Sequence, residues 1–211
     1  KGVDNEFFKD TSLRSNFLCT LGYGIEPKGH PRGARYKFAE VANIIWIINF
    51  MKLIKIKQII NPIETSDGAG VKLKRSIGTH QMDYFDPFLM LDEFGSDNPD
   101  DYISGFPPHP HRGIETVTYM LNGEFEHKDS AGGEGKMSPG DVQWMKTGRG
   151  IIHSEMPAME DGVLHGFQLW INMPSDLKKN KPEYLYIDSE KIPVYEDSEK
   201  NIKIIAGKYL N

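Results

Sequence analysis

Two short motifs carry side chains that could bind a metal ion. His109 and His111 are separated by one residue, and His153 and Glu155 have the same spacing further along the chain. In a β-strand, residues i and i+2 point to the same face, so each pair could direct both side chains to one point. Two such pairs on neighbouring strands would surround one centre with three imidazoles and one carboxylate. The spacing therefore predicts a metal site built from these four residues.

The chemical types of these ligands restrict the metal. Structural zinc sites are usually rich in thiolates, and the chain has a single cysteine, Cys19. Calcium and magnesium prefer shells made of oxygen ligands. A nitrogen-rich set with one carboxylate suits iron, manganese, nickel, copper or cobalt. Four protein ligands on an octahedral ion would leave two positions, enough for a bidentate substrate or for a substrate and dioxygen.

Strands must position these ligands, and the sequence between residues 51 and 181 is typical of strands. Short apolar runs alternate with turn signals there, and helical periodicity is weak. This pattern predicts an all-β sandwich or barrel. Asn122-Gly123 is a strong turn signal, so residues 114–130 are predicted to form a hairpin. One short helix is predicted in residues 175–184, because Ser175 and Asp176 could cap its first turn.

The two ends of the chain differ in character from the middle. Residues 1–50 include a stretch rich in Gly, Pro and basic residues and have no sustained period. They are predicted to be an atypical N-terminal extension, with a docked helix around residues 38–50 as the alternative. The folded domain is predicted to cover residues 51–185, opening with a strand in the alternating segment 52–64. Residues 186–211 are predicted to be a polar linker and the start of a truncated second domain.

Composition excludes several classes of function. The 211 residues carry a formal net charge of −5, which gives no electrostatic reason to expect binding to nucleic acid or to an anionic membrane. The N-terminal residues lack the apolar segment of a secretory signal. The longest apolar stretch, residues 41–51, is about half of the roughly 20 residues that a membrane helix needs. We therefore expect a cytoplasmic or nuclear protein that is not secreted, and one cysteine fits a reducing compartment.

Three segments carry a resemblance to a known family: "FPPHPHRGIETVTYMLNGEFEHKDS", "GKMSPGDVQWMKTGRGIIHSEMP" and "GFQLWINMP". They resemble the signature segments of the pirin family within the cupin superfamily, and the likeness runs from about Met51 to the C-terminus. Pirins carry two cupin barrels (double-stranded β-helix, or jelly-roll, folds), with one mononuclear iron in the N-terminal barrel. The resemblance therefore implies one complete cupin barrel here, with the second barrel largely missing.

The resemblance also implies a function for the predicted site. By motif match the family's iron ligands fall on His109, His111, His153 and Glu155, with iron as the expected cofactor and other divalent transition metals as alternatives. Several members have quercetin 2,3-dioxygenase activity, so a flavonol-like substrate is expected, with Glu155 doubling as its catalytic base. Eukaryotic members imply the alternative, a nuclear, iron-dependent transcriptional co-regulator that binds a transcription factor and has no enzymatic role.

Other polar residues near the motifs are candidates for supporting roles. Glu115 occupies the place of a carboxylate ligand in cupins at large and is expected here to orient a ligand histidine. His127 is expected either to line the pocket or to lie on the surface at a strand end. His165 could be a buried core histidine, and Arg112 could bind an anionic substrate group or form a structural ion pair.

Overall fold

The structure is a computed structural model that describes residues 58–198 and 200–209. The chain divides into two compact units, and Ile56–Ser189 form the larger one. Residues from Glu190 onward belong to the other unit, and each unit is described by itself. The predictions for residues 1–50, and for residues 52–57 of the strand predicted at 52–64, lie outside the described residues. Residues 58–62 are not in a strand, and the first strand that the structure describes begins at Ile63.

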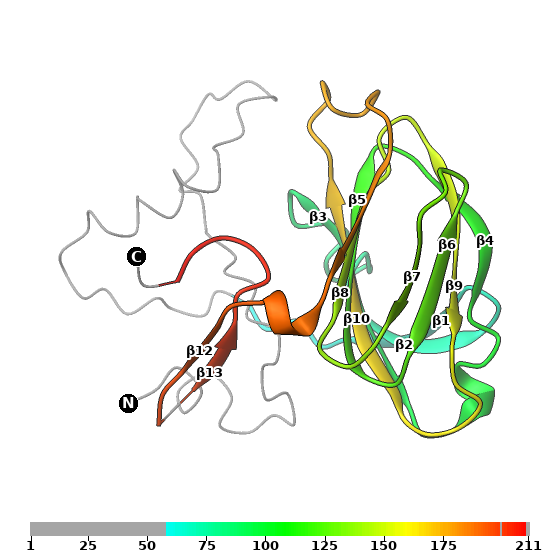
Figure 1. Ribbon diagram of the computed structural model, residues 1–211, viewed down its shortest axis with the longest axis vertical. Coiled ribbons are helices and arrows are strands. Elements are labelled where there is room, and N and C mark those ends of the chain that lie inside the picture. The colour runs from blue at the N-terminus through cyan, green and yellow to red at the C-terminus, as the bar shows by residue number, and fades with distance from the viewer. Residues whose placement is uncertain (1–57, 199, 210–211) are drawn as a thin grey trace. The chain divides into compact units, whose positions relative to one another are not determined.

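The larger unit is a sandwich of two antiparallel sheets that face one another (Figure 1). This arrangement confirms the all-β prediction. Among its described residues, the helical structure is limited to a 3-10 turn at Pro99–Asp101 and the start of another at Ser189–Lys191. In spatial order, the seven-stranded sheet contains β1 (Ile63–Asp67), β2 (Val71–Ile77), β3 (Phe88–Ser96), β10 (Leu164–Asn172), β5 (Ile114–Asn122), β8 (Val142–Lys146) and β11 (Glu183–Ile187). The four-stranded sheet contains β4 (Phe106–His111), β9 (Ile151–Pro157), β6 (Phe125–Asp129) and β7 (Glu134–Met137).

Apolar side chains from both sheets fill part of the space between them. Phe94 on β3 and Phe125 on β6 meet edge to face, with ring centroids 5.4 Å apart. Both rings are almost fully buried, and such a pair stabilises the sandwich beyond its buried area. The core cluster consists of Val71, Leu73, Phe94, Tyr102, Met120, Phe125, Met137 and Leu164.

The turn at Asn122-Gly123 lies where the sequence predicts it, but the hairpin prediction is wrong. β5 and β6 flank this turn and belong to different sheets. Both edges of β5 are occupied by β10 and β8, so β6 pairs with β9 and β7 instead. Gly123 has a φ of +77°, and an added Cβ would lie 2.8 Å from the Val163 carbonyl oxygen. Glycine is therefore required where the chain crosses between the sheets.

The helix predicted at residues 175–184 is also wrong, because this segment forms turns and then enters β11. Tertiary hydrogen bonds outweigh its weak local preference. Lys178 donates from Nζ to the Gly113 carbonyl oxygen at 2.6 Å and to Asn172 Oδ1 at 2.7 Å. These bonds fix the turn on the end of the seven-stranded sheet.

The second unit contains a small hairpin among its described residues. β12 (Val194–Glu196) pairs antiparallel with β13 (Asn201–Lys203), and the 3-10 turn Ser189–Lys191 precedes it. The predicted polar linker therefore contains a strand, and the strand predicted at the end of the chain has a partner. No helix in the described parts of the chain is long and apolar enough to cross a membrane.

Candidate metal centre

The two ligand motifs lie opposite each other on adjacent strands. β4 and β9 pair antiparallel, with His109 opposite His153 and Phe106 opposite Glu155. β4 is an edge strand, which explains how it tolerates three prolines, since a proline cannot donate a hydrogen bond to a neighbouring strand. On β9, His153 and Glu155 are buried, whereas Ile152, the residue before His153, is half exposed. The period of two thus turns both residues of the second motif inward, as the sequence predicts.

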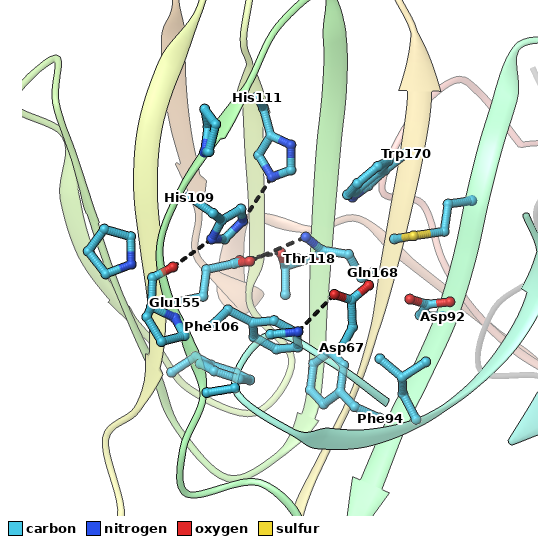
Figure 2. A pocket seen from close by; sticks show the side chains of 18 of the residues that line it. Asp67, Asp92, Phe94, Phe106, His109, His111, Thr118, Glu155, Gln168 and Trp170 are labelled. Carbon is cyan, nitrogen blue, oxygen red and sulfur yellow. Dashed lines mark hydrogen bonds between the residues drawn. The ribbon is translucent and has the colours of Figure 1, made fainter. Parts of the chain in front are cut away.

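Three of the four predicted ligands form a compact cluster. The ligand atoms of His109, His111 and His153 all lie within 4.8 Å of one another. The Nε2 atoms of His109 and His111 are 3.0 Å apart, and Figure 2 shows the two rings converging. The ring of His153 has its centroid 4.5 Å from that of His109 and 4.9 Å from that of His111. Three imidazoles therefore face a common point, as they would around one metal ion.

The electrostatics of the cluster favour neutral imidazoles. Burial, reinforced by neighbouring imidazoles, lowers the pKa of His111 to about 4 and that of His153 to about 3. Both rings are therefore uncharged near neutral pH, the state in which a ring nitrogen has a free lone pair for a metal. His153 Nε2 is buried and has no hydrogen-bond partner within the described part of the chain. A buried polar atom without a partner is costly, and a metal ion at the cluster would satisfy it.

Glu155 lies in the same site but is held by other side chains. Its Oε1 accepts a hydrogen bond of 2.9 Å from Gln143 Nε2 and lies 2.9 Å from Thr118 Oγ1, whose single proton is shared between this oxygen and Gln168 Oε1 at 2.5 Å. Its Oε2 accepts a longer bond of 3.3 Å from Gln168 Nε2. The three donors come from β5, β8 and β10 of the opposite sheet, and Figure 2 shows Thr118 and Gln168 beside the carboxylate. Glu155 is outside the compact histidine cluster, and its role as fourth ligand stays a prediction.

His109, His111 and Glu155 line a cavity of about 720 Å³. This volume is in the range of sites that bind small organic molecules. Phe106 and Trp170 supply aromatic surface, and the Trp170 ring contacts His111 edge to face at 5.0 Å. Asp92 lies on the cavity wall in Figure 2 with both oxygens bonded to Arg75 at 2.8 Å. The cavity thus combines apolar walls with a few fixed polar groups.

Comparison with known proteins decides the family. Residues 70–171 match the model of the family described as Pirin, and this stretch contains all four predicted ligands. This region belongs to the pirin family. Over 158 residues the chain is 50% identical to a Pirin-like protein from Caulobacter vibrioides, which covers 74% of this chain and 57% of that protein. It is 46% identical over 148 residues to Pirin from Homo sapiens, covering 70% and 49%.

A solved structure supports the cupin fold of this pirin domain. The crystal structure of a quercetin 2,3-dioxygenase from Acinetobacter baumannii is 35% identical and superposes with a TM-score of 0.65. The similarity covers 72% of this chain and 56% of that one. The cupin fold expected from the resemblance is therefore confirmed. The chain spans about half the length of the pirin relatives that it matches.

Two supporting residues of the pirin domain differ from their predicted roles. Glu115 does not contact a ligand histidine; its Oε2 accepts a hydrogen bond of 2.6 Å from Trp144 Nε1. Thr118 on β5 faces the cavity and contacts Glu155, so Glu115, three positions earlier on the same strand, points to the other face. His165 is not a core residue, because it is partly exposed and lies 2.9 Å from Glu93 Oε1.

His127 is a buried neighbour of the histidine cluster, so the alternative of a surface position at a strand end is wrong. The side chain is fully buried and its Nδ1 lies 3.3 Å from His153 Nδ1, so it contacts the cluster from behind. The alternation of Phe125, His127 and Asp129 along one short strand was the available signal. This pattern shows that the three residues share one face of the strand, but it does not show which face is buried.

Arg112 lines the cavity and is exposed.

Proposed function

We propose that this pirin-family chain binds one divalent transition metal, with iron preferred, and oxidises flavonol-like substrates with dioxygen. His109, His111 and His153 would hold the metal, with Glu155 as the fourth ligand. The observation that carries the proposal is the buried His153 Nε2, which lacks a partner in the described residues and belongs to a cluster of three converging imidazoles. The name of the quercetin 2,3-dioxygenase from Acinetobacter baumannii supports the choice of reaction.

The donor set fits such a metal. Three neutral imidazole nitrogens and a carboxylate suit iron and its neighbours better than zinc in a thiolate site or calcium in an oxygen shell. When bound, iron would supply Lewis-acid activation of adjacent substrate oxygens and the electron transfer that dioxygen requires.

The protein's own groups would orient and deprotonate the substrate. Glu155 is the proposed base that takes a proton from a substrate hydroxyl. Thr118, Gln143 and Gln168 hold its carboxylate in one orientation, so the accepting oxygen need not reorganise during the reaction. Phe106 and Trp170 offer flat apolar surface to an aromatic ring system and keep water from it.

The test combines metal analysis with turnover. Purified protein is loaded with Fe(II) without oxygen, its metal content is measured, and quercetin is added in air while the visible absorbance is followed. We expect about one iron per chain and loss of the quercetin absorbance. His109→Ala should abolish both results. The control His165→Gln alters a partly exposed histidine paired with Glu93 and should leave both unchanged.

The same experiment separates the enzyme from a metal-dependent binding module. Stoichiometric iron without quercetin turnover would contradict the enzymatic proposal and favour the co-regulator alternative. Retention of stoichiometric iron by His109→Ala would contradict the proposed metal site itself.

A further inference from the structure

A further buried histidine and an aspartate lie behind the cluster formed by His109, His111 and His153. His127 Nε2 lies 3.0 Å from Asp129 Oδ2, and both side chains are fully buried. On its other side, His127 Nδ1 lies 3.3 Å from His153 Nδ1. Asp129, His127 and His153 therefore form a continuous chain of hydrogen bonds that ends at His153 Nε2, which has no hydrogen-bond partner among the described residues.

The protons along this chain can be counted. Asp129 Oδ1 accepts hydrogen bonds from the backbone N–H groups of Ala131 at 2.7 Å and Gly133 at 3.0 Å. Burial alone would raise the pKa of Asp129, but the bonds from His127 and these amides lower it overall, so the carboxylate has no proton to donate. The proton in the bond to His127 must then sit on His127 Nε2.

This assignment fixes the next bond. A neutral imidazole carries one proton, so with Nε2 protonated His127 Nδ1 can only accept. With His127 uncharged, the proton between the two imidazoles belongs to His153 Nδ1. His153 Nε2 then has a free lone pair on the side of His109 and His111, as metal coordination requires.

Neighbouring contacts hold the chain in place. The ring of Tyr184, on β11, stacks on His127 at 4.4 Å with an angle of 9° between the planes. His109 has an analogous support, because its Nδ1 lies 2.7 Å from the Pro107 carbonyl oxygen, which can only accept a hydrogen bond. Each of these two ligands is thus bonded at Nδ1 to an acceptor, and Nε2 is left for the metal.

We propose that Asp129 and His127 are positioning residues that fix His153 as the tautomer with its proton on Nδ1 and its lone pair on Nε2. Their importance for metal affinity rests on the metal site proposed above. The tautomer itself does not, because it can be measured in metal-free protein.

Asp129→Asn is a sharp test because it keeps the size of the side chain. The amide oxygen must face the Ala131 and Gly133 N–H groups, so the amide NH₂ must face His127 Nε2. His127 Nε2 would then accept, its proton would move to Nδ1, and His153 Nδ1 would become the acceptor. The proton of His153 would be transferred to Nε2, where it competes with the metal. One exchanged atom should thus reverse two tautomers.

The tautomers are read by long-range ¹H–¹⁵N correlation of the imidazoles in metal-free protein near neutral pH. We expect His153 to carry its proton on Nδ1 in the wild type and on Nε2 in Asp129→Asn. Fe(II) binding, measured by competition with a chelator, should weaken about 10- to 100-fold in the variant. The control His165→Gln should change neither result, and circular dichroism checks that each variant is folded.

The outcomes separate this proposal from the metal site. A wild type with the His153 proton on Nε2 would overturn the positioning role, and this result needs no variant to fold. A folded Asp129→Asn with unchanged His153 tautomer would overturn it as well. A wild type that shows the expected tautomer but binds no metal would support the positioning role and contradict the proposed metal site.

Discussion

His109 and His153 stand directly opposite each other across the β4–β9 ladder, with ring centroids 4.5 Å apart. This register joins two motifs that are distant in sequence into one cluster. A slip of one residue in this pairing would turn His153 and Glu155 to the outer face of β9. Ile152 would then face the cavity in their place. The pairing of these two strands is therefore as important to the site as the ligands themselves.

Thr118→Val should lower turnover without removing the metal. The variant keeps the shape of the side chain but removes the hydroxyl that bonds to Glu155 Oε1. We expect stoichiometric iron and a roughly tenfold lower kcat with quercetin, equivalent to about 1.4 kcal/mol in the activation barrier.

Thr116→Val is the matched control for that change. Thr116 is buried on the same face of β5, and its hydroxyl has no hydrogen-bond partner in the described residues. Removing this hydroxyl should leave kcat unchanged. Equal losses of kcat in the two variants would contradict the role assigned to Thr118.

Metal-free protein should lose stability on mild acidification. The pKa values of His111 and His153 are lowered to about 4 and about 3 in the folded state, whereas an unfolded histidine has a pKa near 6.5. Below about pH 6.5 the unfolded state binds protons that the folded state does not, so the free energy of unfolding falls with pH. Between pH 6 and 4.5, each of the two histidines lowers the free energy of unfolding by at most about 1.4 kcal/mol for each unit that the pH falls.

Urea unfolding of chelator-treated protein at several pH values checks this expectation. In His153→Gln one titrating group is gone, so its pH dependence should be shallower than that of the wild type. Parallel profiles for the two proteins would show that His153 is not the source of the acid sensitivity.

Asp92→Asn should destabilise the fold. Asp92 is buried and bonded to Arg75 through both oxygens, and loss of its charge leaves the guanidinium with Asp67 as its one anionic partner in the described part of the chain. Removing one member of a buried ion pair costs roughly 3–5 kcal/mol, and the remaining contact with Asp67 should keep the loss near 2–3 kcal/mol. Thermal and urea unfolding of metal-free protein measure it.

An exposed ion pair provides the comparison. Lys146 and Glu183 lie 2.9 Å apart on neighbouring strands, with both side chains substantially exposed. Glu183→Gln should change the free energy of unfolding by less than about 1 kcal/mol. A loss as large as that of Asp92→Asn would refute the argument from burial.

Gly123→Ala should be more destabilising than Gly132→Ala. Both glycines have a positive φ, so alanine is strained at either position. A Cβ at Gly123 would also lie 2.7 Å from Met159 Sδ and 2.8 Å from the Val163 carbonyl oxygen, whereas nothing lies within 4 Å at Gly132. We expect about 1 kcal/mol for Gly132→Ala and a clearly larger loss for Gly123→Ala, measured as a shift in Cm for urea. Equal shifts in Cm would mean that backbone strain accounts for both losses, and would contradict the added cost of the contacts at Gly123.

Residue spacing within a strand was enough to predict which side chains of the site share a face. The spacing of His109 with His111, and of His153 with Glu155, was enough to predict two inward-facing pairs, because strand periodicity needs only the sequence. Partner choice between strands could not be predicted in this way. β5 and β6 separate at Gly123 because other strands, far away in sequence, occupy both edges of β5.

The burial of His127 shows the same limit. Its strand pattern is visible in the sequence, but the stacking ring of Tyr184 comes from β11, 57 positions later in the numbering. The false helix at residues 175–184 has a similar origin, since the long-range bonds of Lys178 decide its conformation.

Glu155 belongs to one sheet, and all three donors to its carboxylate belong to the other. If this carboxylate and the histidines share a metal ion, that ion is mechanically linked to both halves of the sandwich. Loss of the metal would then loosen the domain as a whole instead of one loop. Amides on β5, β8 and β10 would exchange with solvent faster without the metal, and the metal content of the protein would set its lifetime against proteolysis.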